Sequence, residues 1–166
     1  MIIFEDIISG DELFSDAFEP KEVGSTFEID CAMIKVKKGA DVNIGGNASA
    51  EEAEETLEDG EEMLNNVIHS GRLQSTSFDK KAYITFMKGY MKAVKAKLAL
   101  NDVDGKKFES AIATDFKKIV ANLKDYEFYT GESMNPEGAV MLLNYREDGT
   151  TPYFTVFKDG LKSRKV

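Results

Sequence analysis

The feature that most constrains the fold is a pair of apolar stripes with helical spacing in the middle of the chain. Across residues 78–98, apolar side chains recur every three or four positions, at Tyr83, Phe86, Met87, Tyr90, Val94 and Leu98. Across residues 106–124 they recur at Phe108, Ile112, Phe116, Ile119 or Val120, and Leu123. Thr76 followed by Asp79 is a helix-start signal, and residues 101–105 have turn composition. The sequence therefore predicts an antiparallel helical hairpin over residues 76–124.

Segments rich in Ile, Val, Phe and Tyr lie on both sides of this hairpin and predict strands. The predicted strands cover residues 1–8, 27–36, 65–74, 126–129, 138–146 and 153–158. Strands, then helices, then strands indicate an α+β fold, with a mostly antiparallel sheet and the helices on one side. At 166 residues, the chain has the length of a single domain over 1–166.

The charge is distributed unevenly along the chain. Residues 1–74 carry 18 acidic and 5 basic side chains, residues 75–124 carry 5 and 11, and the whole chain has a net charge of −9. An acidic chain is a poor binder of phosphate backbones, so nucleic acid is not an expected partner. No run of 18 apolar residues and no basic leader occur, so the sequence predicts a cytoplasmic protein without a membrane span.

The densest charge lies in residues 51–62, where eight of twelve side chains are acidic and Leu57 is the one large apolar residue. Like charges at this density repel one another, so the sequence predicts a flexible acidic loop over residues 39–62. A loop that binds a partner or a cation is the alternative.

The hairpin carries the opposite charge on its outer side. Lys81, Lys88, Lys92 and Lys95, here called the lysine stripe, are spaced so that they project together from the first helix. The stripe is predicted to contact an acidic partner, and its alternative role is that of an ordinary solvated face.

Cys31 and His69 are single residues of their kind. Thiol catalysis needs a nucleophile and an oriented base, and no basic side chain adjoins Cys31 to lower its pKa. Residues 101–105 imitate a calcium loop, but Leu100 and Ala111 stand where its first and last carboxylates belong. The many carboxylates elsewhere favour weak calcium binding through residues that the sequence does not specify, and no other cofactor is expected.

Several ordered motifs resemble the translationally controlled tumour protein family, also called histamine-releasing factor, over essentially the whole chain. They are the N-terminal Met1-Ile-Ile with Asp11-Glu12, Ile44-Gly-Gly-Asn-Ala-Ser-Ala-Glu51, Leu73-Gln74 with Thr76-Ser-Phe78, Gly131-Glu132 with Met134-Asn-Pro136, and Tyr145-Arg-Glu-Asp-Gly149 with Thr151-Pro-Tyr153. The chain differs from many relatives in lacking a Cys near its end.

This resemblance implies a β-tent, similar to the chaperones of nucleotide-free Rab GTPases and to methionine-sulfoxide reductases, with a projecting helical hairpin and a mobile acidic loop. It also implies a cytosolic protein that binds calcium, tubulin and microtubules, a Rheb-type small GTPase and translation elongation factors in growth and survival control.

The resemblance ties the Asp-Glu pair at Glu12 to GTPase contact. Glu12 follows the first predicted strand in a polar loop, where a carboxylate is exposed; an ordinary surface acid is the alternative reading. Leu73, Gln74 and Glu132 match family motifs and extend the predicted GTPase-facing patch, although Leu73 equally fits a core position.

Two classes of function remain open at this point. The sequence favours a binding and regulatory protein that is not an enzyme. The alternative is a thiol-dependent methionine-sulfoxide reductase, which rests on fold analogy alone.

Overall fold

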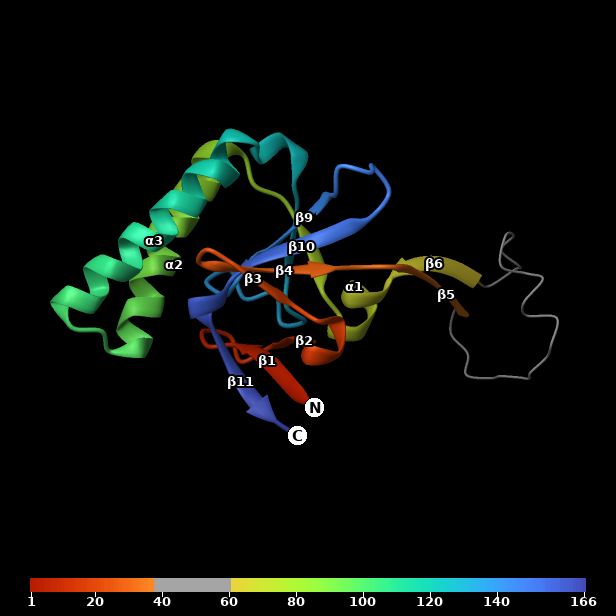
Figure 1. Cartoon of the computed structure of the whole chain (residues 1–166), viewed down its shortest axis with the longest axis horizontal. Helices are drawn as coiled ribbons and strands as arrows, with labels where there is room; N and C mark the ends of the chain where they lie inside the picture. The colour runs from red at the N-terminus through yellow and green to blue at the C-terminus, as the bar shows by residue number, and fades with distance from the viewer. Residues whose placement is uncertain (38–60) are drawn as a thin grey trace.

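The computed structural model describes residues 1–37 and 61–166. It is an α+β fold of three antiparallel sheets with a long helical hairpin at one end and a strand ribbon at the other (Figure 1). This architecture confirms the predicted fold class. Residues 38–60, which include most of the flexible acidic loop predicted over 39–62, lie outside the described residues.

The largest sheet has six strands and supports the hairpin. In spatial order they are β3 (Lys21–Val23), β4 (Thr26–Asp30), β10 (Pro152–Phe157), β9 (Met141–Tyr145), β8 (Glu127–Thr130) and β7 (Gln74–Thr76). Every neighbouring pair is antiparallel. Strands from the two ends of the sequence thus meet at β4 and β10 in the centre of the sheet.

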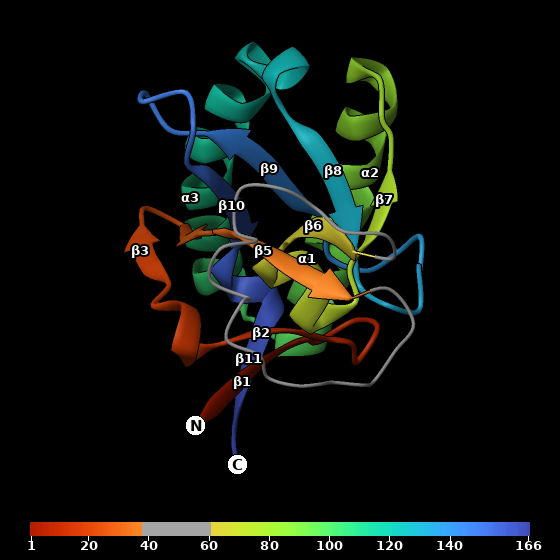
Figure 2. The same cartoon turned by 90° about the vertical axis from the view of Figure 1, so that its right-hand side faces the viewer.

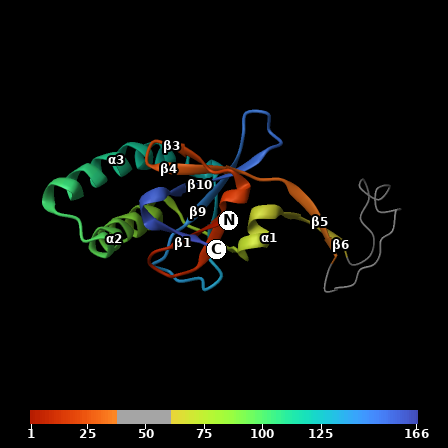
Figure 3. The ribbon, with the colours of Figure 1, turned by 60° about the horizontal axis from the view of Figure 1, so that its bottom comes forward.

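The two termini meet in a second, three-stranded sheet. Its order is β11 (Leu161–Lys165), β1 (Ile2–Asp6) and β2 (Glu12–Ser15), with β1 pairing antiparallel to both neighbours. Figure 3 shows the N- and C-termini close together. The sequence predicts β1 but not β2, β3 or β11, because all three strands are short and β3 and β11 are largely polar.

A two-stranded ribbon of β5 (Met33–Lys37) and β6 (Glu61–Asn65) extends away from the body on the side opposite the hairpin (Figure 1). In Figure 2 the ribbon therefore lies in front of the body, with the two helices of the hairpin behind it. The strand predicted over residues 27–36 is therefore two strands, β4 and β5, in different sheets. Glu61 and Glu62 pair with β5, so they belong to β6 rather than to the predicted acidic loop over 39–62.

The hairpin consists of α2 (Lys80–Leu98) and α3 (Asp102–Ala121). Asp79 is the N-cap of α2 and accepts a hydrogen bond from the Ala82 N–H, which corrects the predicted start at Thr76. Asn101 caps α3, so residues 102–105 form its first turn instead of a loop. Within the described residues, three short 3-10 turns complete the connections, at Asp16–Phe18, Leu123–Asp125 and Lys158–Gly160.

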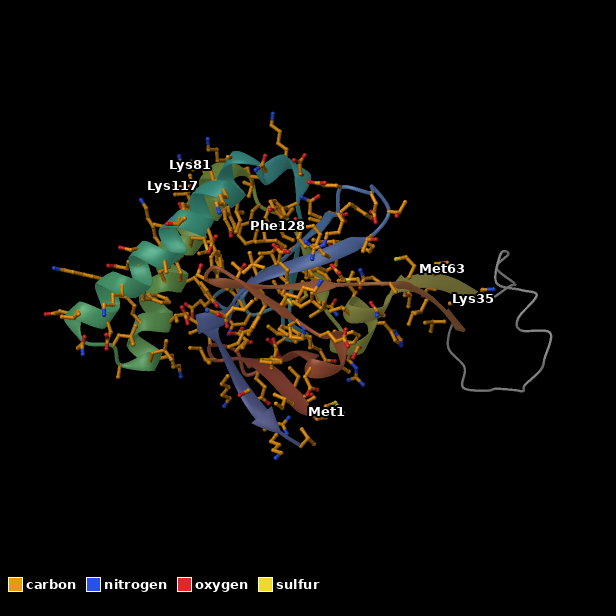
Figure 4. The ribbon with its side chains drawn as sticks, viewed as in Figure 1. Met1, Lys35, Met63, Lys81, Lys117 and Phe128 are labelled. Atoms are coloured by element: carbon orange, nitrogen blue, oxygen red, sulfur yellow. The ribbon has the colours of Figure 1, made fainter. Side chains whose placement is uncertain are left out.

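The apolar stripes of the two helices pack against the large sheet. Tyr83, Met87, Tyr90 and Val94 are buried, as predicted, while Leu98 is exposed near the tip of the hairpin. Phe128 of β8 lies among the packed side chains between helices and strands (Figure 4). Its ring centroid is 5.8 Å from that of Tyr83. Within the described residues, no helix is long and apolar enough to cross a membrane.

The segment predicted as a strand over residues 65–74 is instead a short helix, α1 (Asn66–Gly71), followed by β7. The Asn65 side chain accepts hydrogen bonds from the Val67 and Ile68 N–H groups, which starts the helix. A short apolar run does not by itself distinguish a helix from a strand. Here the Asn65 cap and the complete burial of Val67 favour the helix.

Candidate functional site

Glu12 is the first residue of β2 and lies on the outer face of the three-stranded sheet, opposite Glu5 of β1. The structure thus corrects its predicted place in a loop, while its side chain remains 58 % exposed. Arg164 of β11 reaches across β1 and donates from Nη2 to the Glu12 carboxylate. Glu12 is therefore an exposed acid with an internal counter-ion.

The same arginine also holds Glu5. Arg164 Nε donates to Glu5 Oε2 at 2.9 Å, and the Lys162 Nζ lies 3.7 Å from the other Glu5 oxygen. The Arg164 hydrogen bond lowers the pKa of Glu5. Three strands are thus joined by one network of two acids and two bases. The sequence gives no local sign of this role for Arg164, because it lies 152 residues from Glu12.

Glu132 lies in the turn after β8, and Arg72 at the end of α1 donates from Nη1 to its Oε2 at 3.2 Å. Glu12 and Glu132 line a common hollow of about 420 Å³. This acidic hollow is lined by Gly10, Asp11, Glu12, Ser70, Gly71, Arg72 and Glu132. The structure therefore brings together two of the four residues predicted to face a GTPase.

The other two predicted residues have different surroundings. Leu73 is 5 % exposed and belongs to the hydrophobic core, the alternative that the sequence left open. Gln74 is half-buried in β7, and its Nε2 donates to the backbone oxygen of Arg72 at 3.0 Å. Gln74 therefore supports the turn that carries Arg72.

Close packing fixes the wall of the acidic hollow. Asp11 Oδ2 accepts hydrogen bonds from Ser133 Oγ at 2.6 Å and from Ser133 N at 3.3 Å, joining two segments 122 residues apart. A Cβ on Gly131 would collide with the Asp11 carboxylate, and a Cβ on Gly71 would collide with the backbone oxygen of Leu13. Glycine is required at both positions for this close approach.

The lysine stripe lies on α2, opposite its buried face. Lys81, Lys88 and Lys92 are exposed, whereas Lys95 is partly covered and pairs with Glu109 of α3, with Nζ and Oε1 2.8 Å apart. In Figure 4, Lys81 of α2 and Lys117 of α3 are both labelled at the end of the hairpin away from its tip. The predicted stripe therefore has three exposed lysines and a fourth that pairs with an acid of the neighbouring helix.

The single thiol is poorly suited to catalysis. Cys31 is 7 % exposed, its Sγ lies 3.6 Å from the backbone oxygen of Ile29, and burial raises its pKa to about 11. His69 is an exposed residue of α1. Among residues 1–37 and 61–166, no three His, Cys, Asp or Glu side chains gather closely enough to hold a metal ion.

Comparison with known proteins gives a consistent result. The family model described as "Translationally controlled tumour protein" matches residues 1–162. The homologue from Candida albicans is 56 % identical and that from Saccharomyces cerevisiae 52 % identical, each with full coverage of both chains.

The solved structure of the Schizosaccharomyces pombe protein p23fyp, described as a translationally controlled tumor-associated protein, is 55 % identical with a TM-score of 0.82 over all of both chains. The protein from Caenorhabditis elegans is 27 % identical with a TM-score of 0.71, covering 100 % of this chain and 99 % of that one. The chain described here belongs to the translationally controlled tumour protein family.

Proposed function

We propose that this chain is a cytoplasmic binding and regulatory protein without catalytic turnover, and that it uses two separate surfaces. The acidic hollow receives a Rheb-type small GTPase, and the lysine stripe contacts tubulin and microtubules. A translation elongation factor is a third partner, implied by family membership and assigned to no surface. In this role the protein takes part in growth and survival control.

The observation that carries the GTPase proposal is the presence of Glu12 and Glu132 in one hollow. Asp11, Glu12 and Glu132 outnumber the single cation of the lining, Arg72, so the surface is complementary to a basic segment. A carboxylate delivered beside a nucleotide site would also compete with phosphate for Mg²⁺, which favours the nucleotide-free form of the GTPase.

The tubulin proposal is supported by the charge of α2, which contains six lysines and no acidic residue. Lysines at helical spacing present a continuous positive edge, and the acidic tails of tubulin are complementary to it. Calcium is a weak ligand in this proposal, with a dissociation constant of roughly 10⁻⁴ M or higher, because scattered carboxylates do not form a closed cage. No tightly bound cofactor is required.

The reductase alternative is disfavoured by Cys31. A thiol with a pKa near 11 is almost entirely protonated at neutral pH, and the thiolate is the attacking species. We expect iodoacetamide to alkylate the folded protein far more slowly than the protein unfolded in urea. Methionine-sulfoxide reduction that is lost on Cys31→Ser would contradict this assignment.

The GTPase proposal is tested by Glu12→Gln, with Glu147→Gln in the exposed β9–β10 loop as a matched control. The free energy of unfolding of both variants should lie within about 0.5 kcal/mol of that of the wild-type protein. Calorimetry with the nucleotide-free GTPase should show binding weakened by about 1–3 kcal/mol for Glu12→Gln alone. Equal affinity of all three folded proteins would return Glu12 to the role of an ordinary surface acid.

A further inference from the structure

The acidic hollow continues beyond Glu12 into a second, smaller hollow of about 100 Å³. The two share three lining residues, Glu12, Ser70 and Gly71. Met1 and Ile3, at the start of β1, are among the residues that line the second hollow. The surface around Glu12 is therefore a groove with two chemically different halves.

The outer face of the three-stranded sheet explains this division. Ile3 and Glu5 are two residues apart on β1 and point to the same side, and Glu5 lies opposite Glu12. Across the sheet, Glu5 lies between the charged Lys162 and Glu12, whereas the adjacent row has the apolar Ile3 between Arg164 and Ser15. Met1 adds an apolar side chain that is 64 % exposed, next to the half-buried Ile3.

The dimensions limit what each half can hold. An apolar cavity of about 150 Å³ accommodates a benzene ring, so the 100 Å³ hollow suits a smaller, aliphatic side chain. The acidic half measures about 420 Å³ and has room for a long basic side chain. Residues two apart in an extended segment project to the same side, so a single strand can offer both groups to the groove.

We infer that the groove recognises an extended segment with a basic residue and, two positions away, an aliphatic residue. The basic group enters the acidic hollow, and the aliphatic group covers Met1 and Ile3. The inference rests on the proposed function, in which the segment belongs to the small GTPase. It adds an apolar determinant of specificity to a contact otherwise described by charge alone.

A peptide titration tests the groove without the GTPase. The isotopically labelled full chain is titrated with acetyl-Gly-Arg-Gly-Leu-Gly-amide, and amide chemical shifts are followed. We expect saturable changes at Glu12 and Ile3, with a dissociation constant on the order of 1 mM. Replacing Leu by Ser should remove the changes at Ile3, and replacing Arg by Gln should remove those at Glu12. Absence of saturable shifts at Ile3 would overturn the inference.

The second arm uses the nucleotide-free GTPase with Ile3→Thr and its matched control Ile2→Thr, the same change one residue away on the opposite face of β1. Ile3→Thr should weaken binding about three- to tenfold through lost apolar contact, with an unchanged salt dependence, whereas Ile2→Thr should not weaken it. Normal binding by folded Ile3→Thr would refute the groove and leave the proposed function standing. A wild-type protein that fails to bind the GTPase, but still binds the peptide as expected, would refute the proposed function alone.

Discussion

The acidic hollow and the lysine stripe differ in how their charges are arranged. The stripe comes from one helix, and three of its four lysines extend into solvent. The hollow comes from β2, α1 and the turn after β8, and its carboxylates are held by Arg164, Arg72 and Ser133. Among the described residues, Lys95 is the member of the stripe that pairs with an acid, whereas Glu12, Glu132 and Asp11 in the hollow each have a partner held by the fold.

This difference predicts two modes of recognition. Uncompensated lysines generate a field that attracts an acidic partner from a distance and is screened by salt. Hydrogen-bonded carboxylates have fixed positions. They therefore favour a partner whose donors fit that geometry over one that merely carries a positive charge. The predictions below test this contrast, beginning with the largest expected effect.

Gly71→Ala should destabilise the fold, because the new Cβ would meet the backbone oxygen of Leu13 in a strand that cannot yield easily. Overpacking of this kind costs about 1–3 kcal/mol of unfolding free energy. The matched control is Gly89→Ala on the lysine-stripe helix, where the new Cβ would meet no described atom within 4 Å beyond its chain neighbours and the backbone of its own helix. It should stabilise the protein by up to about 1 kcal/mol. Urea unfolding that gives the same shift for both variants would show that the wall of the hollow is not closely packed.

Reversing three charges of the stripe, by Lys81→Glu, Lys88→Glu and Lys92→Glu, should lower affinity for tubulin by more than about tenfold and flatten its salt dependence. Lys95 is kept, because it pairs with Glu109. The control reverses Lys106, Lys107 and Lys118 on α3, which changes the net charge equally. Identical losses in both triple variants would mean that tubulin senses net charge and not the stripe.

Arg164→Gln should produce the smallest effect and in the opposite direction. Removing the internal counter-ion frees the Glu12 carboxylate, so GTPase binding should tighten about two- to fivefold, in line with the modest strength of exposed ion pairs. Lys165→Gln is the control, because Lys165 is the next residue on the same strand and lies opposite Ile2, whereas Arg164 lies opposite Ile3. The gain should vanish in a Glu12→Gln background. Weaker binding by Arg164→Gln would instead make Arg164 a residue that positions Glu12 for its partner.

Local periodicity accounts for the parts of the fold that the sequence predicted. The stripes at Tyr83, Met87, Tyr90 and Val94 specify α2 and its buried face, and the lysine stripe follows from the same spacing. Periodicity failed for residues 65–74, where α1 depends on capping by Asn65 and on burial of Val67. It also placed the start of α3 late, because Asn101 and Asp102 resemble turn residues while serving as a helix cap and first turn.

The candidate site was only partly predictable for the same physical reason. Glu12 and Glu132 were recognised from motifs, but their contacts come from Arg164 and Arg72, 152 and 60 residues away. Ordinary arginines in polar segments carry no local signal of such a role. Leu73 matched a motif yet belongs to the core, since a motif does not separate packing from contact with a partner.

The central claim is that the two surfaces serve different partners. Its most direct test is to measure binding of nucleotide-free GTPase and of tubulin, each to Glu12→Gln and to the Lys81→Glu, Lys88→Glu, Lys92→Glu variant, in the same buffer. We expect Glu12→Gln to lose affinity for the GTPase alone, and the triple variant to lose affinity for tubulin alone. Loss of both partners in either folded variant, or loss of the same partner in both, would contradict the separation of the two surfaces.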